Sequence, residues 1–286
     1  LFALAEQQRL SEPTVLSAEV ERMLADEKAA AFFENFTSQW LDLDAIYNIA
    51  INPEFFPDFD DRTKEVMIEE TIAFFTQLVK NDRSALDLID SKDAMLNAEL
   101  AEHYDIPGIA GEELRPVTLP AESQRGGILT HGSILTLNSS GDDTHPIKRG
   151  VWVLERLLGD PPPPPPPAVP TLAEESGNGD RQSLKEKLEA HREQDACMTC
   201  HSKIDPWGVA FENYDGVGKW RSTTAGAEPV LATSSPPKPE GELFFPKQKS
   251  VAAPKLTVPE NASARVRTAY REVNTRLEDL QRPHNH

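Results

Sequence analysis

Cysteine is scarce in this chain. Only Cys197 and Cys200 occur among its 286 residues, and just two residues separate them. Two thiols so close in sequence cannot cross-link distant segments, which excludes a disulfide-stapled scaffold. Long apolar runs are also missing, because no stretch reaches the roughly 18 residues that a membrane-crossing helix requires. The sequence therefore predicts no transmembrane segment in this chain.

Basic residues are outnumbered by acidic ones, 29 to 47, which gives a formal net charge of −18. Such a surface repels nucleic acid and anionic lipid, so nucleic acid is not an expected partner. The chain starts at Leu1 with neither Met nor an apolar leader, and we expect the start of the precursor to be missing. The length of 286 residues allows one large or two small domains, each with a core, and a hydrophobic content of 38% indicates that the chain as a whole is not disordered.

The first part of the chain, residues 1–115, is expected to be a helical domain. Pro53 and Pro57 interrupt it and predict a loop. On either side, apolar residues recur at the three- and four-residue spacing of helices, and we interpret these stripes as core. The stripes are Phe32, Phe33, Phe36 and Trp40 after Val20, Met23 and Leu24; then Ile68, Ile72, Phe75 and Val79; then Leu96, Leu100 and Tyr104.

The middle of the chain, residues 116–160, is expected to be a loop-rich segment followed by a helix. "RPVTLP" and "ILTHGSILTLNSSGDD" mix β-branched residues with turn formers and predict a short strand or two. "IKRGVWVLERLLGD" returns to a helical pattern, with Gly159 placed as its C-terminal cap.

Seven consecutive prolines, Pro161–Pro167, follow this helix. They predict an extended left-handed strut of roughly 20 Å, which we interpret, with its linker over 161–180, as a spacer. A recognition site for a proline-binding module is the alternative. "SLKEKLEAHREQDACMTCH" then predicts a helix capped by Ser183, with the two cysteines at its end. Residues 223–286 are rich in Pro, Ser and Ala and predict an extended tail with a candidate helix at its end.

The two cysteines are followed at once by His201, a spacing that three chemistries use. Structural zinc requires about four Cys or His ligands, usually as two pairs, and the chain has no second pair. A thioredoxin-like dithiol occupies a strand-to-helix turn, and no strand is expected before Cys197. Covalent haem uses every position, because both thiols bind the porphyrin and the histidine binds the iron. Residues 181–222 are therefore predicted to be a small cytochrome c-like module with one haem c.

The residues after the motif are interpreted as a wall of the haem site. Pro206 is expected to offer its backbone carbonyl to the second ring nitrogen of His201 and so to orient the ligand. Trp207 is expected to give apolar cover, although an ordinary small core also explains the aromatic residues here. The other candidate wall residues are Phe211, Tyr214 and Trp220.

The sixth iron ligand is not an ordinary downstream methionine, because none follows the motif and Met198 lies inside it. His191 lies ten residues before His201, about 15 Å along a continuous helix, which is too far for the same iron. His131 occupies a Gly-bounded apolar segment, where a neutral imidazole requires a partner. An open position also remains. The other histidines considered are His103, His145, His284 and His286.

Three consecutive segments resemble the large secreted c-type cytochrome family of planctomycetes and verrucomicrobia, over about residues 1–221. They are "FTSQWLDL...LNAELAEHYDIPG", "RGGILTHGSILTLNSSGDDTHPIKRGVWVLERLLGDPPPPPPP" and "HREQDACMTCHSKIDPWGVAFENYDGVGKWR". In that family the haem motif precedes Asp-Pro-x-Gly and a Glu-Asn-Phe-Asp-like run. The matching residues here are Asp205, Pro206, Gly208, Glu212, Asn213, Tyr214 and Asp215.

The resemblance implies a c-type cytochrome in the periplasm or outside the cell. It also implies His131 as an iron ligand beside His201, because that position in the family is often Met or His. Two departures stand out: His145 replaces a commoner serine, and the family's C-terminal helical segment is not recognisable after Arg221.

The expected fold class is mainly α, with a helical N-terminal bundle, a loop-rich middle segment, a polyproline strut, the haem module and an extended tail. The expected function is electron transfer with a redox partner protein or with other subunits of a larger complex. A haem oxidoreductase with an open or displaceable sixth ligand is one alternative. A structural haem-bearing subunit is another, and no catalytic group stands out.

Overall fold

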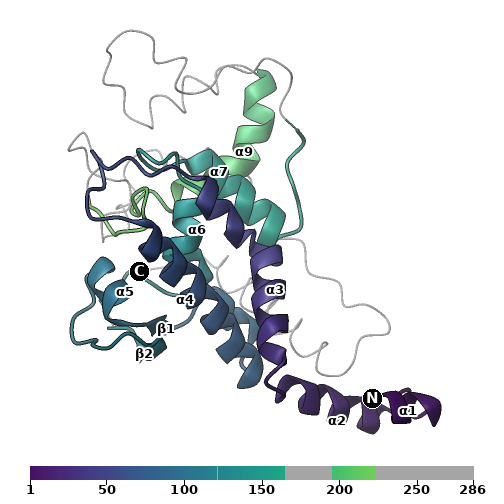
Figure 1. Cartoon of the computed structure of the whole chain (residues 1–286). Helices are drawn as coiled ribbons and strands as arrows, with labels where there is room; N and C mark the ends of the chain where they lie inside the picture. The colour runs from purple at the N-terminus through teal and green to yellow at the C-terminus, as the bar shows by residue number, and fades with distance from the viewer. Residues whose placement is uncertain (121, 165–194, 223–286) are drawn as a thin grey trace, which may run out of the picture. The chain divides into compact units, whose positions relative to one another are not determined.

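The computed structural model describes residues 1–120, 122–164 and 195–222, and it describes only the backbone of residues 195–197 and 199. Apart from Ser84–Leu86, these residues belong to one compact unit, and helices predominate in it, which confirms the mainly α class. The helical elements (Figure 1) are α1 Phe2–Glu6, α2 Pro13–Leu24, α3 Ala29–Leu41, η1 Leu43–Asn48, α4 Asp61–Lys80, η2 Ala85–Leu88, α5 Ala98–His103, η3 Ile128–Thr130, α6 Gly132–Leu137, α7 Pro146–Trp152, the π-helix η4 Val153–Leu157 and α9 Asp195–Val209.

The 20-residue helix α4 is the central element of this unit. It begins at Asp61 because the side chain of Asp60 accepts a hydrogen bond from the backbone N–H of Thr63, at 2.9 Å. Buried residues recur along it at helical spacing, among them Val66, Phe74 and Leu78. This face packs against α3, α5, α6, η1 and the strand β1, so α4 joins the predicted N-terminal bundle to the middle segment.

The aromatic stripe of α3 is only partly core. Phe33 is buried, but the side chains of Phe32 and Phe36 are 51% and 44% exposed. Phe36 stacks on Phe75 of α4 with ring centroids 5.4 Å apart. The prediction that the whole stripe is core was therefore wrong, because the run of aromatic residues is wider than the face of α3 that α4 covers.

Two short antiparallel strands, β1 (Asp93–Leu96) and β2 (Arg115–Thr118), pair so that Asp93 faces Thr118 and Leu96 faces Arg115. The strand predicted in "RPVTLP" is confirmed. The helical stripe predicted from Leu96 was wrong at its start, because Leu96 ends β1 and α5 begins only at Ala98. The side chain of Asn97 caps α5 by accepting from the N–H of Leu100.

The predicted helix over 147–160 is confirmed as α7 followed by η4, and Gly159 has the left-handed φ of +62° expected of a cap. The "ILTHGSILTL" stretch forms η3 and α6, where we expected loop or strand. Trp152 of α7 donates its indole N–H to the carbonyl of Leu41 at 3.0 Å. Residues predicted as the middle segment therefore share one core with the N-terminal helices.

Several sequence predictions lie outside the described residues: the strut beyond Pro164, the linker, Ser183, His191 and the tail over 223–286. Pro161–Pro164 belong to neither a helix nor a strand. Among the described residues, we find no helix with the length and apolar character needed to cross a membrane.

Candidate functional site

The Cys-x-x-Cys-His motif lies on α9, which continues for two turns beyond His201 and contains Pro206. The expectation that the motif ends a helix was therefore wrong. Cys197, Cys200 and His201 occupy positions i, i+3 and i+4 of α9, a spacing that belongs to one face of a helix. Of these three, the structure describes the side chains of Cys200 and His201.

Helix α9 is held against α7 by direct backbone contact. A Cβ on Gly208 would overlap the carbonyl oxygen of Pro146, and a Cβ on Gly150 would overlap that of Ile204. Only glycine permits such close approach. Because Pro146 meets Gly208 and Gly150 meets Ile204, the two helices run in opposite directions. The position of the motif helix is thus set by two glycines, one on each helix.

His201 is oriented by a carboxylate. Its Nδ1 lies 2.9 Å from Oδ1 of Asp205, and the two residues are only 8% and 2% exposed. We expected the carbonyl of Pro206 in this role, and the structure places the carboxylate of Asp205 there. Pro206 lies inside α9, where a backbone carbonyl points along the helix axis, whereas Asp205 is four residues after His201 and shares its face. With Nδ1 bonded to Asp205, Nε2 is the ring nitrogen placed to bind a metal.

The other predicted wall residues divide into two groups. Trp207 and Trp220 are 42% and 39% exposed, and the neighbouring Met198 is 45% exposed. Phe211 packs against the main apolar core, and Tyr214 is buried. The predicted aromatic cover is therefore divided between buried residues and exposed ones, the exposed ones being Trp207 on α9 and Trp220 in the loop after it.

The chemistry of this donor set fits a haem c. Cys200 is half-buried and belongs to no disulfide, and the carboxylate–imidazole pair is the usual support of a metal-binding histidine. Among the described residues, α9 included, no cluster of three or more His, Cys, Asp or Glu is arranged to hold a metal ion directly.

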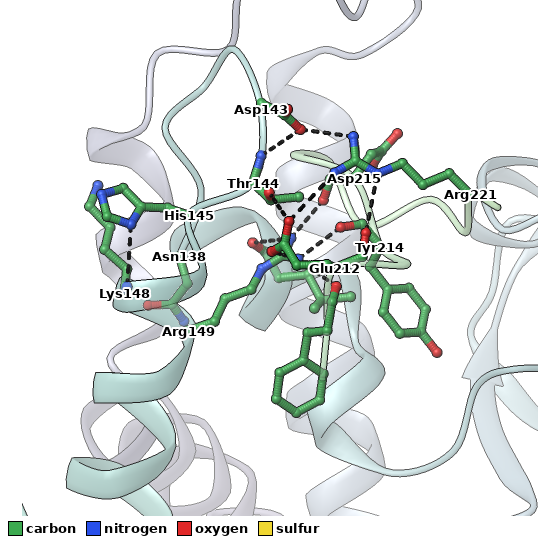
Figure 2. A network of polar contacts seen from close by, with 12 residues as sticks. Asn138, Asp143, Thr144, His145, Lys148, Arg149, Glu212, Tyr214, Asp215 and Arg221 are labelled. Carbon is green, nitrogen blue, oxygen red and sulfur yellow. Dashed lines mark hydrogen bonds and ion pairs between the residues drawn. The ribbon is translucent and has the colours of Figure 1, made fainter. Parts of the chain in front are cut away.

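The loop after α9 is anchored by a buried arginine (Figure 2). Arg149 of α7 is 2% exposed and donates hydrogen bonds of 2.7, 2.8 and 2.7 Å to the carbonyls of Phe211, Tyr214 and Asp215. Its guanidinium also lies 3.8 Å from the carboxylate of Glu212. Burial lowers the pKa of Arg149 to about 10, although the nearby acids oppose this. One side chain thus closes the loop onto α7.

A second arginine completes this network in Figure 2. Arg221 pairs with Asp143 at 2.8 Å, and Glu212 accepts from the hydroxyl of Thr144 at 2.7 Å. Burial raises the pKa of Glu212, and the charge of Arg149 opposes this shift. Glu212 and Arg221 lie beside residues that we interpreted as a haem wall, and they attach the loop after α9 to Asp143 and Thr144. The charged residue within the apolar pattern of α7 was the signal that could have revealed this anchor.

His131 lies at the start of α6 and is only 2% exposed. Its Nδ1 is 2.9 Å from the hydroxyl of Thr71, and its ring meets that of Phe74 edge-on at 5.0 Å. Nε2 is buried and has no hydrogen-bond partner among the described residues. Burial lowers the pKa of His131 to about 3. The contacts recorded for His131 are with α4, so the described structure does not bring it to His201.

Two other candidate ligands, His103 and His145, lie among the described residues, and both make contacts that stabilise the fold. Nε2 of His103 donates to the carbonyl of Val217 at 2.8 Å. His145, at the position where the resembled family commonly has serine, caps α7, because its Nδ1 accepts from the N–H of Lys148 at 3.3 Å. His131 is thus the one of these three whose side chain has a buried nitrogen without a recorded partner.

Sequence reasoning missed a buried polar group beside His131. The hydroxyl of Tyr104 donates to Glu70 at 2.6 Å and accepts from the N–H of Gly132 at 2.9 Å. The guanidinium of Arg125 lies 3.6 Å from the centre of the Tyr104 ring. Burial raises the pKa of Glu70 to about 7. The signal was present, because Glu70 falls on the apolar stripe of α4 between Val66 and Phe74.

Two family models match consecutive parts of the chain. Residues 1–106, which include α1 to α5, match a model described as PSD4, a protein of unknown function (DUF1592). Residues 125–224, which include α6, α7 and α9, match one described as PSCyt3, a protein of unknown function (DUF1588). Both fit the planctomycete-type cytochrome c-like proteins that the sequence resembles. No curated protein and no solved structure matched the chain.

Proposed function

We propose that this protein is a c-type cytochrome with one covalently bound haem that exchanges electrons with a partner redox protein. Cys197 and Cys200 would hold the haem through thioether bonds, and Nε2 of His201 would bind the iron. The observation that carries the proposal is the buried His201–Asp205 pair on α9, the helix whose sequence contains both cysteines. Haem, when bound, supplies a one-electron carrier.

The protein's own residues would position that carrier. Asp205 holds the orientation of His201, and the contact between Gly208 and Pro146 holds α9 against α7. The exposed side chains of Met198 and Trp207 offer apolar surface to a cofactor or a partner. The net charge of −18 favours a partner with a basic face. The resemblance to secreted cytochromes supports a periplasmic or extracellular location and a place among other subunits of a complex.

Covalent attachment can be tested on the full chain expressed with a cytochrome c maturation system. Haem should remain with the polypeptide in a denaturing gel and after acid acetone, because thioether bonds survive both treatments. Cys197→Ala and Cys200→Ala should each weaken this retention. Met198→Ala, which lies within the motif but bears no thiol, is the matched control. Complete extraction of haem from the unaltered protein would rule out the proposal.

His131 is our proposed sixth ligand, and its buried Nε2 without a recorded partner supports the assignment. His131→Ala should then convert a six-coordinate, low-spin haem into one that binds carbon monoxide quickly. His131→Met should restore low-spin ligation at a higher potential, because methionine favours reduced iron. His103→Ala, another buried histidine, is the control. An unaltered low-spin spectrum in His131→Ala would assign the ligand elsewhere.

The alternative function is a haem oxidoreductase with an open sixth position. The contacts of His131 favour it, because they lie on α4 and not on α9. Rapid carbon monoxide binding by the unaltered protein would support this alternative, and a six-coordinate, unreactive haem would support electron transfer.

A further inference from the structure

The acceptor for Nδ1 of His201 is a side-chain carboxylate and not a backbone carbonyl. Oδ1 of Asp205 lies 2.9 Å away, and the exposed fraction of Asp205 is 2%. A carboxylate can only accept at this position, so the imidazole places its proton on Nδ1. A hydrogen bond to a charged acceptor is roughly twice as strong as one between neutral groups, and burial strengthens it further.

The geometry of this pair is fixed by the helix that carries it. His201 and Asp205 are four residues apart on α9, and Ile204 lies directly before Asp205. A Cβ on Gly150 of α7 would overlap the carbonyl oxygen of Ile204, so the two helices are closely packed at this point. This packing limits movement of the Asp205 backbone toward α7.

We propose that Asp205 is a positioning residue that lowers the reduction potential of the haem iron through His201. The inference rests on the proposed function. A ring nitrogen that donates to a carboxylate makes the imidazole more basic, and a more basic ligand stabilises ferric iron relative to ferrous iron. The haem would then be a better electron donor than one whose histidine is held by a neutral carbonyl.

Asp205→Asn separates charge from geometry, because the amide oxygen still accepts from Nδ1 but carries no full charge. We expect at least a tenfold shift of the iron equilibrium toward the ferrous form, about 59 mV for one electron. The measurement is a spectroelectrochemical titration of the haem-loaded full chain. Asp160→Asn is the matched control. It removes an exposed carboxylate that pairs with Lys203 of α9, and it should leave the potential nearly unchanged.

The failures of the two proposals are distinguishable. Haem staining reports attachment in every variant, so a wild-type chain without covalent haem overturns the proposed function. A haem-loaded Asp205→Asn protein with the potential of the wild type overturns the role of Asp205.

A second measurement needs no haem. Nitrogen NMR of the haem-free full chain with labelled histidines should show His201 protonated on Nδ1, its signal assigned by loss in His201→Gln. A neutral imidazole with its proton on Nε2 and none on Nδ1 would contradict the proposal directly.

Discussion

Two buried histidines in this molecule have opposite surroundings. His131 is packed between α4 and α6, where Nδ1 meets the neutral hydroxyl of Thr71 and burial lowers its pKa to about 3. His201 lies on α9, where Nδ1 meets the carboxylate of Asp205. The same residue type is therefore held neutral in one region and supplied with a basic partner in the other. The comparison teaches that burial alone does not define the chemistry of a histidine, because the group that faces Nδ1 differs between these two sites.

The difference extends to the regions around the two histidines. The α4 side is held mainly by apolar contacts and contains the acid Glu70, whose charged form burial disfavours. The α9 side is held by charges, because Arg149 and Arg221 fasten the loop over 211–221 to α7 and to Asp143. Each side should therefore respond differently to the loss of a charge.

The largest effect is expected on the charged side. Arg149→Met removes the hydrogen-bond donor to the carbonyls of the loop after α9. It also removes the nearby positive charge from the buried carboxylate of Glu212. We expect a loss of roughly 3–5 kcal/mol in the free energy of unfolding, measured by urea denaturation. Arg156→Met, which breaks a half-exposed pair with Asp42, is the control and should cost about 1 kcal/mol or less. Equal losses in the two variants would erase the distinction between the regions.

The α4 side should lose stability as pH rises. The pKa of Glu70 is raised in the folded state to about 7 from an ordinary 4.5, so the folded protein binds the extra proton between these values. Stability is then greatest below about pH 4.5 with respect to this group and falls by about 3 kcal/mol up to pH 7. Glu70→Gln, which keeps an acceptor for Tyr104, should abolish this fall in unfolding experiments across the range.

The exposed neighbour Glu69 on the same helix provides the matched control. Glu69→Gln should leave the pH dependence of unfolding as it is in the unaltered protein. If Glu70→Gln and the unaltered protein lose the same stability between pH 4.5 and 7, Glu70 is charged in the folded state and the described contrast between the two sides is wrong.

The smallest effect concerns the start of α7. His145→Ala removes the acceptor for the N–H of Lys148 and should cost about 1 kcal/mol, whereas His145→Ser should restore most of it. Thermal unfolding of the three proteins measures the difference. A serine variant no more stable than the alanine variant would show that the imidazole contributes by packing and not as a cap.

Local features were predictable from the sequence because they depend on residues within about four positions. The left-handed Gly159, the loop around Pro53 and the strand at Arg115–Thr118 all follow from such neighbours. The spacing of Cys197, Cys200 and His201 likewise predicts its chemistry without any knowledge of the fold. Each of these inferences required only the conformational preferences of a short segment.

Tertiary structure decided what lies around those features. Periodicity placed Phe32 and Phe36 in the core, but the width of the α3–α4 contact leaves them exposed. Arg149 reaches the carbonyl of Phe211 across 62 positions of the chain, and no local pattern reports such a contact. Asp205, and not the expected Pro206, contacts Nδ1 of His201, because α9 continues through the motif and directs the Pro206 carbonyl along the helix axis. The sequence by itself thus determined which residues are the candidate ligands, whereas the surroundings of His201 and His131 depended on segments that only folding brings together.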